Sequence, residues 1–255
     1  MPADAIVEVT EVGKIYEGGV EALTRINLAL PQGRLSTLLG PSGCGKTTLL
    51  KIIAGLIAPS RGEVRVKGKK VEGPGPERAF VFQDFALLPW ANVLRNVAFG
   101  LELRGLTKEE RHQIARKHIA EVGLKAFESS YPHQLSGGMR QRVGLARALA
   151  VDADIILMDE PFSSVDEQTR RKFQEELLDL LKHKKKTVIF VTHSIEEAAY
   201  LSDQIVLLSA RPGTVSKIIQ PSINREGRGP EEIRRDKNYL DAVDEIWQIL
   251  KKDLE

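Results

Sequence analysis

One segment of the chain has the residue types and spacing of a phosphate-binding loop. Gly40, Gly45, Lys46 and Thr47 match the pattern G-x-x-x-x-G-K-[ST]. Glycines let the backbone turn its N–H groups inward, and a helix that starts there adds partial positive charge. In such a loop the lysine reaches the β- and γ-phosphates, and the next hydroxyl binds Mg²⁺. The expected nucleotide-binding residues are Gly40, Pro41, Ser42, Gly43, Cys44, Gly45, Lys46, Thr47 and Thr48.

Two adjacent carboxylates follow a run of apolar residues. Residues 155–158 are typical of a buried central strand, and Asp159 and Glu160 come at its end. Asp159 suits coordination of Mg²⁺ through water, whereas Glu160 can polarise the water that attacks a γ-phosphate. Acidic pairs at strand ends are common, so this segment alone leaves a purely structural role open.

Three more side chains lie where a ligand is expected. Gln83 ends the apolar strand 79–83 and His193 follows the strand 187–192, and open α/β sheets bind ligands at the carboxyl ends of their strands. Gln83 can offer its carbonyl oxygen to Mg²⁺ or to the attacking water, and His193 can sense a γ-phosphate. Tyr16, at an expected loop edge, can stack on adenine. Each also has a structural alternative, either backbone hydrogen bonding or, for Tyr16, half-burial in a strand.

A second glycine-containing turn precedes a helix. Ser136, Gly137 and Gly138 come shortly before the helical stretch 143–149, so they offer a hydroxyl and bare backbone at a helix N-terminus. This is a second candidate phosphate site, and the alternative is an ordinary N-cap. The loop 163–166 carries short polar side chains that can contact a neighbouring molecule.

Strands and one helical stretch must position these residues. Residues 35–39 read as a buried strand before the phosphate loop, and residues 48–54 have helical apolar spacing. Alternating patterns predict further strands at 6–10, 26–30 and 63–67, and the apolar run at 204–209 predicts another. From 93 to about 149 the pattern is helical, with Thr107 and Glu110 as a capping box. The sequence therefore predicts an α/β protein with an α-helical insertion.

Composition narrows the class of protein. The 255 residues carry 37 basic and 35 acidic side chains, a net charge of +2, which gives no bulk electrostatic reason to expect a nucleic-acid binder. The single cysteine, Cys44, excludes an internal disulfide framework. We find no secretory signal and no run of about 20 apolar residues. A soluble cytoplasmic protein is expected, with any membrane role exerted through a partner.

The residues after about 221 form a separate segment. A polar linker is followed by apolar residues on one helical face. Docking of this helix on its own domain is one interpretation, and a regulatory or dimer contact is the other. The residues of that face are Tyr239, Val243, Ile246, Trp247 and Leu250.

Taken in their order along the chain, these motifs closely resemble those of the ATP-binding-cassette ATPases. The resemblance covers about residues 5–220. It implies a P-loop NTPase fold, α/β with a RecA-like core, an N-terminal antiparallel β subdomain, and a helical insertion at roughly 88–150 that carries the signature. The ATPase domain would be 1–221, and 222–255 a C-terminal extension with one amphipathic helix. The resemblance also implies ATP and Mg²⁺ as cofactors.

The resemblance further implies roles for individual residues. Lys46, Gln83, Glu160 and His193 would be catalytic, and Tyr16 would stack on adenine. Two copies would pair head to tail, so that the signature of one closes over ATP on the other. The signature residues are Ser136, Gly137, Gly138 and Gln141, the D-loop residue is Asp166, and the magnesium residues are Thr47, Gln83 and Asp159, the last through water. Val165 departs conservatively from the leucine of many members.

Membrane partners also follow from the resemblance. Two integral membrane permease subunits would contact the surface near Leu87–Trp90, and an extracytoplasmic solute-binding protein would act indirectly, with the chain peripheral on the cytoplasmic face of the inner membrane. Motifs at 73–75, 87–93, 96–100 and 209–213, which are less specific than the catalytic motifs, are similar to those of the nitrate, sulfonate and taurine importer branch. A soluble non-transport ATPase of the same superfamily is the alternative.

Overall fold

The computed structural model describes residues 4–163, 166–182, 186–225 and 227–252, without the side chains of residues 169 and 180–182. The chain divides into two compact units. The first is built from residues 1–75 and 185–255, and the second from residues 76–184. The predicted domain boundaries at 88–150 and 221 remain predictions, and each unit is described below by itself.

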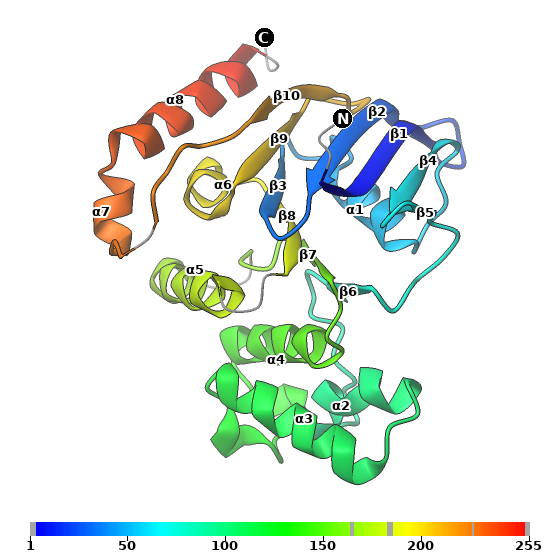
Figure 1. Cartoon of the computed structure of the whole chain (residues 1–255), viewed down its shortest axis with the longest axis vertical. Helices are drawn as coiled ribbons and strands as arrows, with labels where there is room; N and C mark the ends of the chain where they lie inside the picture. Colours follow the sequence, from blue (N-terminus) through cyan, green and yellow to red (C-terminus); the bar gives the residue numbers. More distant parts are fainter. Residues whose placement is uncertain (1–3, 164–165, 183–185, 226, 253–255) are drawn as a thin grey trace. The chain divides into compact units, whose positions relative to one another are not determined.

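The first unit contains an antiparallel sheet and a mainly parallel group of strands (Figure 1). In the antiparallel sheet the order is β2-β1-β4-β5. In the second group β3 pairs in parallel with both β8 and β9, and β10 pairs antiparallel to β9. The strands are β1 (Ala5–Ile15), β2 (Glu21–Pro31), β3 (Leu35–Leu39), β4 (Arg61–Val66), β5 (Lys69–Lys70), β8 (Thr187–Thr192), β9 (Gln204–Leu208) and β10 (Val215–Ile219).

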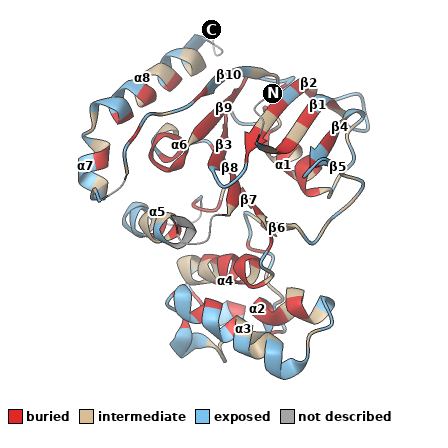
Figure 2. Cartoon of the chain, viewed as in Figure 1, coloured by how far each residue is buried: buried red, intermediate tan, exposed pale blue. Residues whose placement is uncertain are grey.

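The helices of the first unit are α1 (Lys46–Ala54), α6 (Ile195–Leu201), α7 (Pro230–Arg234) and α8 (Lys237–Lys252). Helix α1 contacts both groups of strands, through β2 and β8. β3 and β9 are buried at every position (Figure 2). Because parallel strands are commonly covered on both faces, they tend to have apolar residues at successive positions.

The C-terminal helix α8 docks on its own unit. Ile246 packs with Ile205, Leu207 and Ile219, and Lys217 Nζ donates to Glu245 Oε1 at 2.6 Å. The predicted inward face is wrong at one position, because Trp247 is 57% exposed. The extension also contains the short α7 in addition to the one helix expected.

The described part of the second unit contains four α-helices, of which α2, α3 and α4 contact one another, and a parallel pair of strands. The capping box of α3 is confirmed, since the backbone N–H of Thr107 donates to Glu110 Oε2 at 3.0 Å and the Glu110 N–H donates to Thr107 Oγ1 at 3.4 Å. The helices are α2 (Val93–Leu103), α3 (Lys108–Glu121), α4 (Gly137–Ala150) and α5 (Glu167–Lys182), and the strands are β6 (Arg78–Val81) and β7 (Ile155–Asp159).

The strands next to the expected site were predicted well, and the ends of others were not. β3 and β8 have the predicted bounds. β1 and β2 are longer than predicted, and β6 ends at Val81, so Gln83 lies in an exposed turn beyond the strand. Local turn geometry after Val81, which periodicity does not encode, is the reason for this difference.

Candidate functional site

The predicted phosphate loop connects β3 to α1 in the first unit. α1 begins at Lys46, immediately after Gly45. Gly43 and Gly45 have φ values of 77° and 99°, which lie in the left-handed region that side-chain-bearing residues avoid. A β-carbon at Gly45 would also lie 2.6 Å from Leu23 Cδ2. Glycine is therefore required here both by backbone conformation and by packing.

The base of the loop is packed tightly against the end of β9 and the turn that follows it. A β-carbon at Gly40 would lie 2.6 Å from the carbonyl oxygen of Leu208, and one at Gly213 would lie 2.0 Å from that of Cys44. The Gly213 N–H donates to the Ala22 carbonyl at 3.0 Å, which ties this turn to β2. The segment 209–213, noted in the sequence for its similarity to importer motifs, thus packs against the phosphate loop.

Lys46 points into the loop. Its Nζ donates to the carbonyl oxygens of Gly40 at 2.7 Å and Pro41 at 2.8 Å, and the side chain is buried. Burial raises the pKa of the neighbouring Cys44 thiol, which keeps it protonated beside the ammonium group. A cationic side chain within left-handed glycine backbone at a helix N-terminus fits a bound phosphate.

The predicted adenine-stacking residue, Tyr16, lies beside the first turn of α1. Its hydroxyl is 3.1 Å from Thr48 Oγ1, and Lys14 Nζ lies 5.4 Å from the ring centroid. Tyr16 follows the end of β1 and is 42% exposed, so it lies at the expected loop edge. Stacking on adenine and a partly buried structural role both remain interpretations of this position.

His193 directly follows β8, next to the strand that leads into the phosphate loop. Leu39 and Thr192 are register partners in the parallel pair β3 and β8, so Gly40 and His193 leave the sheet at the same carboxyl edge. The chain after His193 is fixed, because Thr192 Oγ1 donates to Glu197 Oε2 at 2.5 Å and Ser194 caps α6. The imidazole itself is exposed.

In the second unit the same register argument applies to Gln83 and Glu160. Val81 pairs with Met158 in the parallel strands β6 and β7, and each residue of interest lies two positions further on. Glu160 has φ of 44°, a conformation that costs a non-glycine residue about 1–2 kcal/mol. Ser163 holds it there, since its Oγ donates to the Glu160 carbonyl at 3.0 Å. Asp159, one residue earlier, is buried.

The predicted signature starts helix α4. Ser136 is its N-cap and accepts a hydrogen bond from the Met139 N–H at 3.3 Å, while the residue itself remains exposed. Both interpretations from the sequence are therefore compatible here, because a capping serine can also face solvent. Gln141 is buried, and its amide nitrogen has no hydrogen-bond partner among the described residues.

The predicted catalytic residues are thus divided between the two units. The phosphate loop, Tyr16 and His193 belong to the first. Gln83, Asp159, Glu160, the signature and Asp166 belong to the second. Asp166 is exposed before α5, whereas Ser164 and Val165 of the same loop lie outside the described residues.

The segment 87–90, here called the Trp90 turn, is an exposed apolar turn. Trp90 is 69% exposed. Asn96, which sequence reasoning did not single out, is fully buried and bonds to both sides of this turn: its Oδ1 accepts from the Leu88 N–H at 2.8 Å and its Nδ2 donates to the Ala91 carbonyl at 2.8 Å. In the sequence, the signal that could have pointed to Asn96 is a polar amide residue directly before the mainly apolar stretch 97–101.

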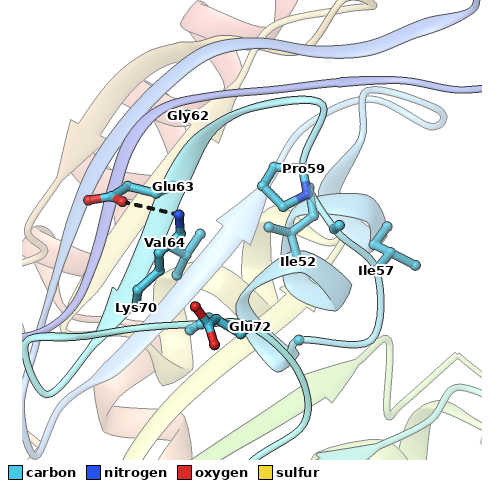
Figure 3. A pocket seen from close by; sticks show the side chains of 11 residues that line it. Ile52, Ile57, Pro59, Gly62, Glu63, Val64, Lys70 and Glu72 are labelled. Atoms are coloured by element: carbon cyan, nitrogen blue, oxygen red, sulfur yellow. Dashed lines mark ion pairs between the residues drawn. The ribbon is translucent and has the colours of Figure 1, made fainter.

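A pocket of about 310 Å³ lies at the other end of α1, beside β4 and β5 (Figure 3). Its walls include Ile52, Ile57 and Val64, and Lys70 Nζ lies 3.8 Å from Glu63 Oε2 at its edge. None of the predicted nucleotide-binding residues lines it.

Two further properties bear on cofactors and membranes. The described residues contain no group of three or more histidine, cysteine or acidic side chains placed to hold a metal ion. Magnesium in nucleotide sites is instead held by one or two protein oxygens together with phosphates and water. No helix in the described part of the chain is long and apolar enough to cross a bilayer.

Comparisons with known proteins agree with this geometry. Residues 23–163 match a family model described as "ABC transporter". The chain is 50% identical to an uncharacterized ABC transporter ATP-binding protein of Methanocaldococcus jannaschii, over 97% of this chain and 92% of that protein. It is 47% identical to the taurine import ATP-binding protein TauB of Escherichia coli, over 88% and 89% of the two chains.

Solved structures give the same result. A dimeric ATP-binding cassette in a post-hydrolysis state, bound to ADP and Pi, has a TM-score of 0.75 and 34% identity, covering 84% of this chain and 98% of that one. A dimeric bacterial ABC transporter cassette has a TM-score of 0.76 and 33% identity. These matches confirm the predicted P-loop NTPase fold. The chain therefore belongs to the ABC transporter family, as one of its ATP-binding proteins.

Proposed function

We propose that this chain is the ATP-hydrolysing subunit of an importer for a small anion or organic solute such as taurine, another sulfonate or nitrate. The observation that carries the ATPase part is the phosphate loop, with Gly43 and Gly45 left-handed and Lys46 buried inside it. Support for import comes from the 47% identity to a taurine import ATP-binding protein.

In this proposal the phosphate loop and the residues near it in sequence or function each bind a different part of the Mg²⁺–ATP complex. The inward N–H groups of residues 43–48 and Lys46 hold the phosphates, and the Tyr16 ring stacks on the base. Thr47 and Asp159 are the residues that would hold Mg²⁺, which supplies charge neutralisation at the phosphates. The exposure of Tyr16 and the burial of Lys46 support these roles.

Glu160 and His193 would act on the terminal phosphate. Glu160 orients the attacking water and accepts its proton, and Gln83 contacts the same water or the metal. His193 donates a hydrogen bond to the γ-phosphate. The strained φ of Glu160 supports a catalytic role, because such strain is concentrated at functional sites.

Two copies of the chain would assemble head to tail, each signature completing the other's site. The exposed Ser136 at the start of α4 supports this, since one chain carries two phosphate-binding helix ends for one γ-phosphate. The related cassettes of known structure are dimeric. The Trp90 turn would contact a membrane permease subunit, because exposed apolar residues of this kind mark interaction surfaces.

A soluble ATPase without a transport role is the alternative function. The two are separated by assembling the chain with candidate permease subunits and solute-binding proteins in vesicles. An importer subunit hydrolyses ATP faster when a cognate loaded binding protein is added and drives solute uptake. ATP hydrolysis that no permease and no binding protein alters would favour the soluble enzyme.

A further inference from the structure

Arg147, on helix α4, which Ser136 caps, contacts the backbone immediately before the Trp90 turn. Its Nη2 donates to the carbonyl oxygen of Phe85 at 2.6 Å, and its Nη1 donates to that of Ala86 at 2.8 Å. All of these residues belong to the second unit. One side chain thus joins the signature helix to the segment that follows Gln83.

The two carbonyl groups come from an unusual piece of backbone. Phe85 and Ala86 have φ values of 63° and 42°, so two successive residues with side chains occupy the left-handed region. Such conformations persist when surrounding contacts impose them. Phe85 is buried, and a β-carbon built on Gly144, one turn before Arg147 on α4, would lie 3.9 Å from Phe85 Cβ, which is ordinary van der Waals contact.

The charge of Arg147 makes it unfavourable to separate the segment 85–86 from α4. No carboxylate within ion-pair distance of Arg147 is found in the described part of the chain, so the two carbonyl dipoles are its hydrogen-bond partners. Arg147 is partly buried, and this burial lowers the pKa of its guanidinium. If the segment 85–86 moved away from α4, the partly buried guanidinium would lose its hydrogen-bond acceptors, and this raises the free energy of the moved state.

Asn96 holds the turn from its other side, through Leu88 and Ala91. The exposed Trp90 therefore sits on a short segment fixed at one end to α4 and at the other to α2.

We propose that Arg147 is a positioning residue that couples movement of the signature helix to the Trp90 turn, and through it to the permease subunit. This rests on the proposed function, since the permease is the partner that receives the movement. The coupling runs through the bidentate contact, because a planar guanidinium can hold two adjacent carbonyl groups and an ammonium group cannot reproduce that geometry.

The test uses Arg147→Lys, with Arg147→Gln as a second variant that removes the partly buried charge. Both are made in a Trp247→Phe background, in which Trp90 is the single tryptophan of the chain. Arg104→Lys is the matched control, because Arg104 Nη2 also donates to a backbone carbonyl, that of Pro76 at 2.8 Å, away from the turn.

We expect the Arg147 variants to bind ATP within about twofold of the parent, because the phosphate loop belongs to the other unit. Trp90 fluorescence anisotropy should fall, and stimulation of ATPase activity by the assembled permease should fall about fivefold or more. Arg104→Lys should change neither quantity.

The outcomes separate this inference from the proposed function. If the parent chain is not stimulated by any permease, the importer proposal fails. If the parent is stimulated and both Arg147 variants are stimulated equally, with unchanged Trp90 anisotropy, the coupling role of Arg147 is wrong.

Discussion

The α-carbon of Gly213 lies so close to the carbonyl oxygen of Cys44 that a β-carbon built there would be 2.0 Å from it. Cys44 is in the phosphate loop, and Gly213 is in the turn between β9 and β10, far away in sequence. The backbone of Gly213 is not in the left-handed region, so an alanine is conformationally allowed there. Steric contact with the loop is what requires glycine at this position.

Gly213→Ala should therefore weaken nucleotide binding. Relieving the contact pushes the Cys44 carbonyl away and distorts the N–H groups around it, and we expect ATP affinity to fall about tenfold or more, equivalent to about 1.4 kcal/mol. Titration with a fluorescent ATP analogue, below the unfolding temperature, measures this. Gly73→Ala is the control, because a β-carbon at Gly73 meets nothing within 4 Å. Equal affinity of the two variants would refute the supporting role of Gly213.

Tyr16→Ala should lower ATP affinity by about 5- to 150-fold, the range expected for loss of one base–aromatic stack. Tyr16→Phe keeps the ring and loses only the hydroxyl contact to Thr48. It should bind within about twofold of the parent. Isothermal titration with ATP distinguishes the two variants, and a phenylalanine variant as weak as the alanine variant would assign the effect to the hydroxyl group.

A mixture of Lys46→Ala and Ser136→Ala chains tests the head-to-tail arrangement. Each variant alone has every site damaged. In a mixed dimer both defects fall on one site, and the second site combines an intact loop with an intact signature. ATPase activity of the mixture should clearly exceed that of either variant alone, measured over a range of mixing ratios. If each loop used the signature of its own chain, mixing would restore nothing.

Glu160→Gln should bind ATP but turn it over about 100-fold more slowly or worse, because general-base catalysis contributes about 10²–10⁴ in rate. The closed dimer should then accumulate with ATP, which light scattering after gel filtration detects. The isosteric amide keeps the side-chain volume at this strained backbone position. Turnover at the parent rate would remove Glu160 from the reaction.

Burial raises the pKa of the Cys44 thiol, with Lys46 opposing the shift, so the folded chain holds this proton more tightly than the unfolded chain. The resulting stability is complete below the unfolded pKa of about 8.5 and is lost as pH rises toward the folded value. Cys44→Ala should therefore lose less stability than the parent between neutral pH and about pH 10. Urea unfolding midpoints across this range measure the difference, and parallel pH profiles would contradict the assignment.

Several elements around the candidate site could be predicted from the sequence because they depend on residues that are close together in the chain. The phosphate-loop motif, the strands 35–39 and 187–192, and the capping box at Thr107 each depend on residues within one turn or strand. The structure confirms the two strands and the capping box, and nucleotide binding by the loop stays a prediction. Trp247 shows the limit, since helical periodicity cannot say how wide a buried face is. Its neighbours Ile246 and Tyr239 are covered by the unit while Trp247 is not.

Contacts between distant segments were decided by tertiary structure alone. Gly213 beside Cys44 and Arg147 on the carbonyls of Phe85 and Ala86 join segments that no spacing rule relates. They use backbone carbonyl groups, which every residue carries, so the sequence holds no mark of the acceptor. The sequence by itself determined which residues could bind a nucleotide; packing decided which residues hold them in place.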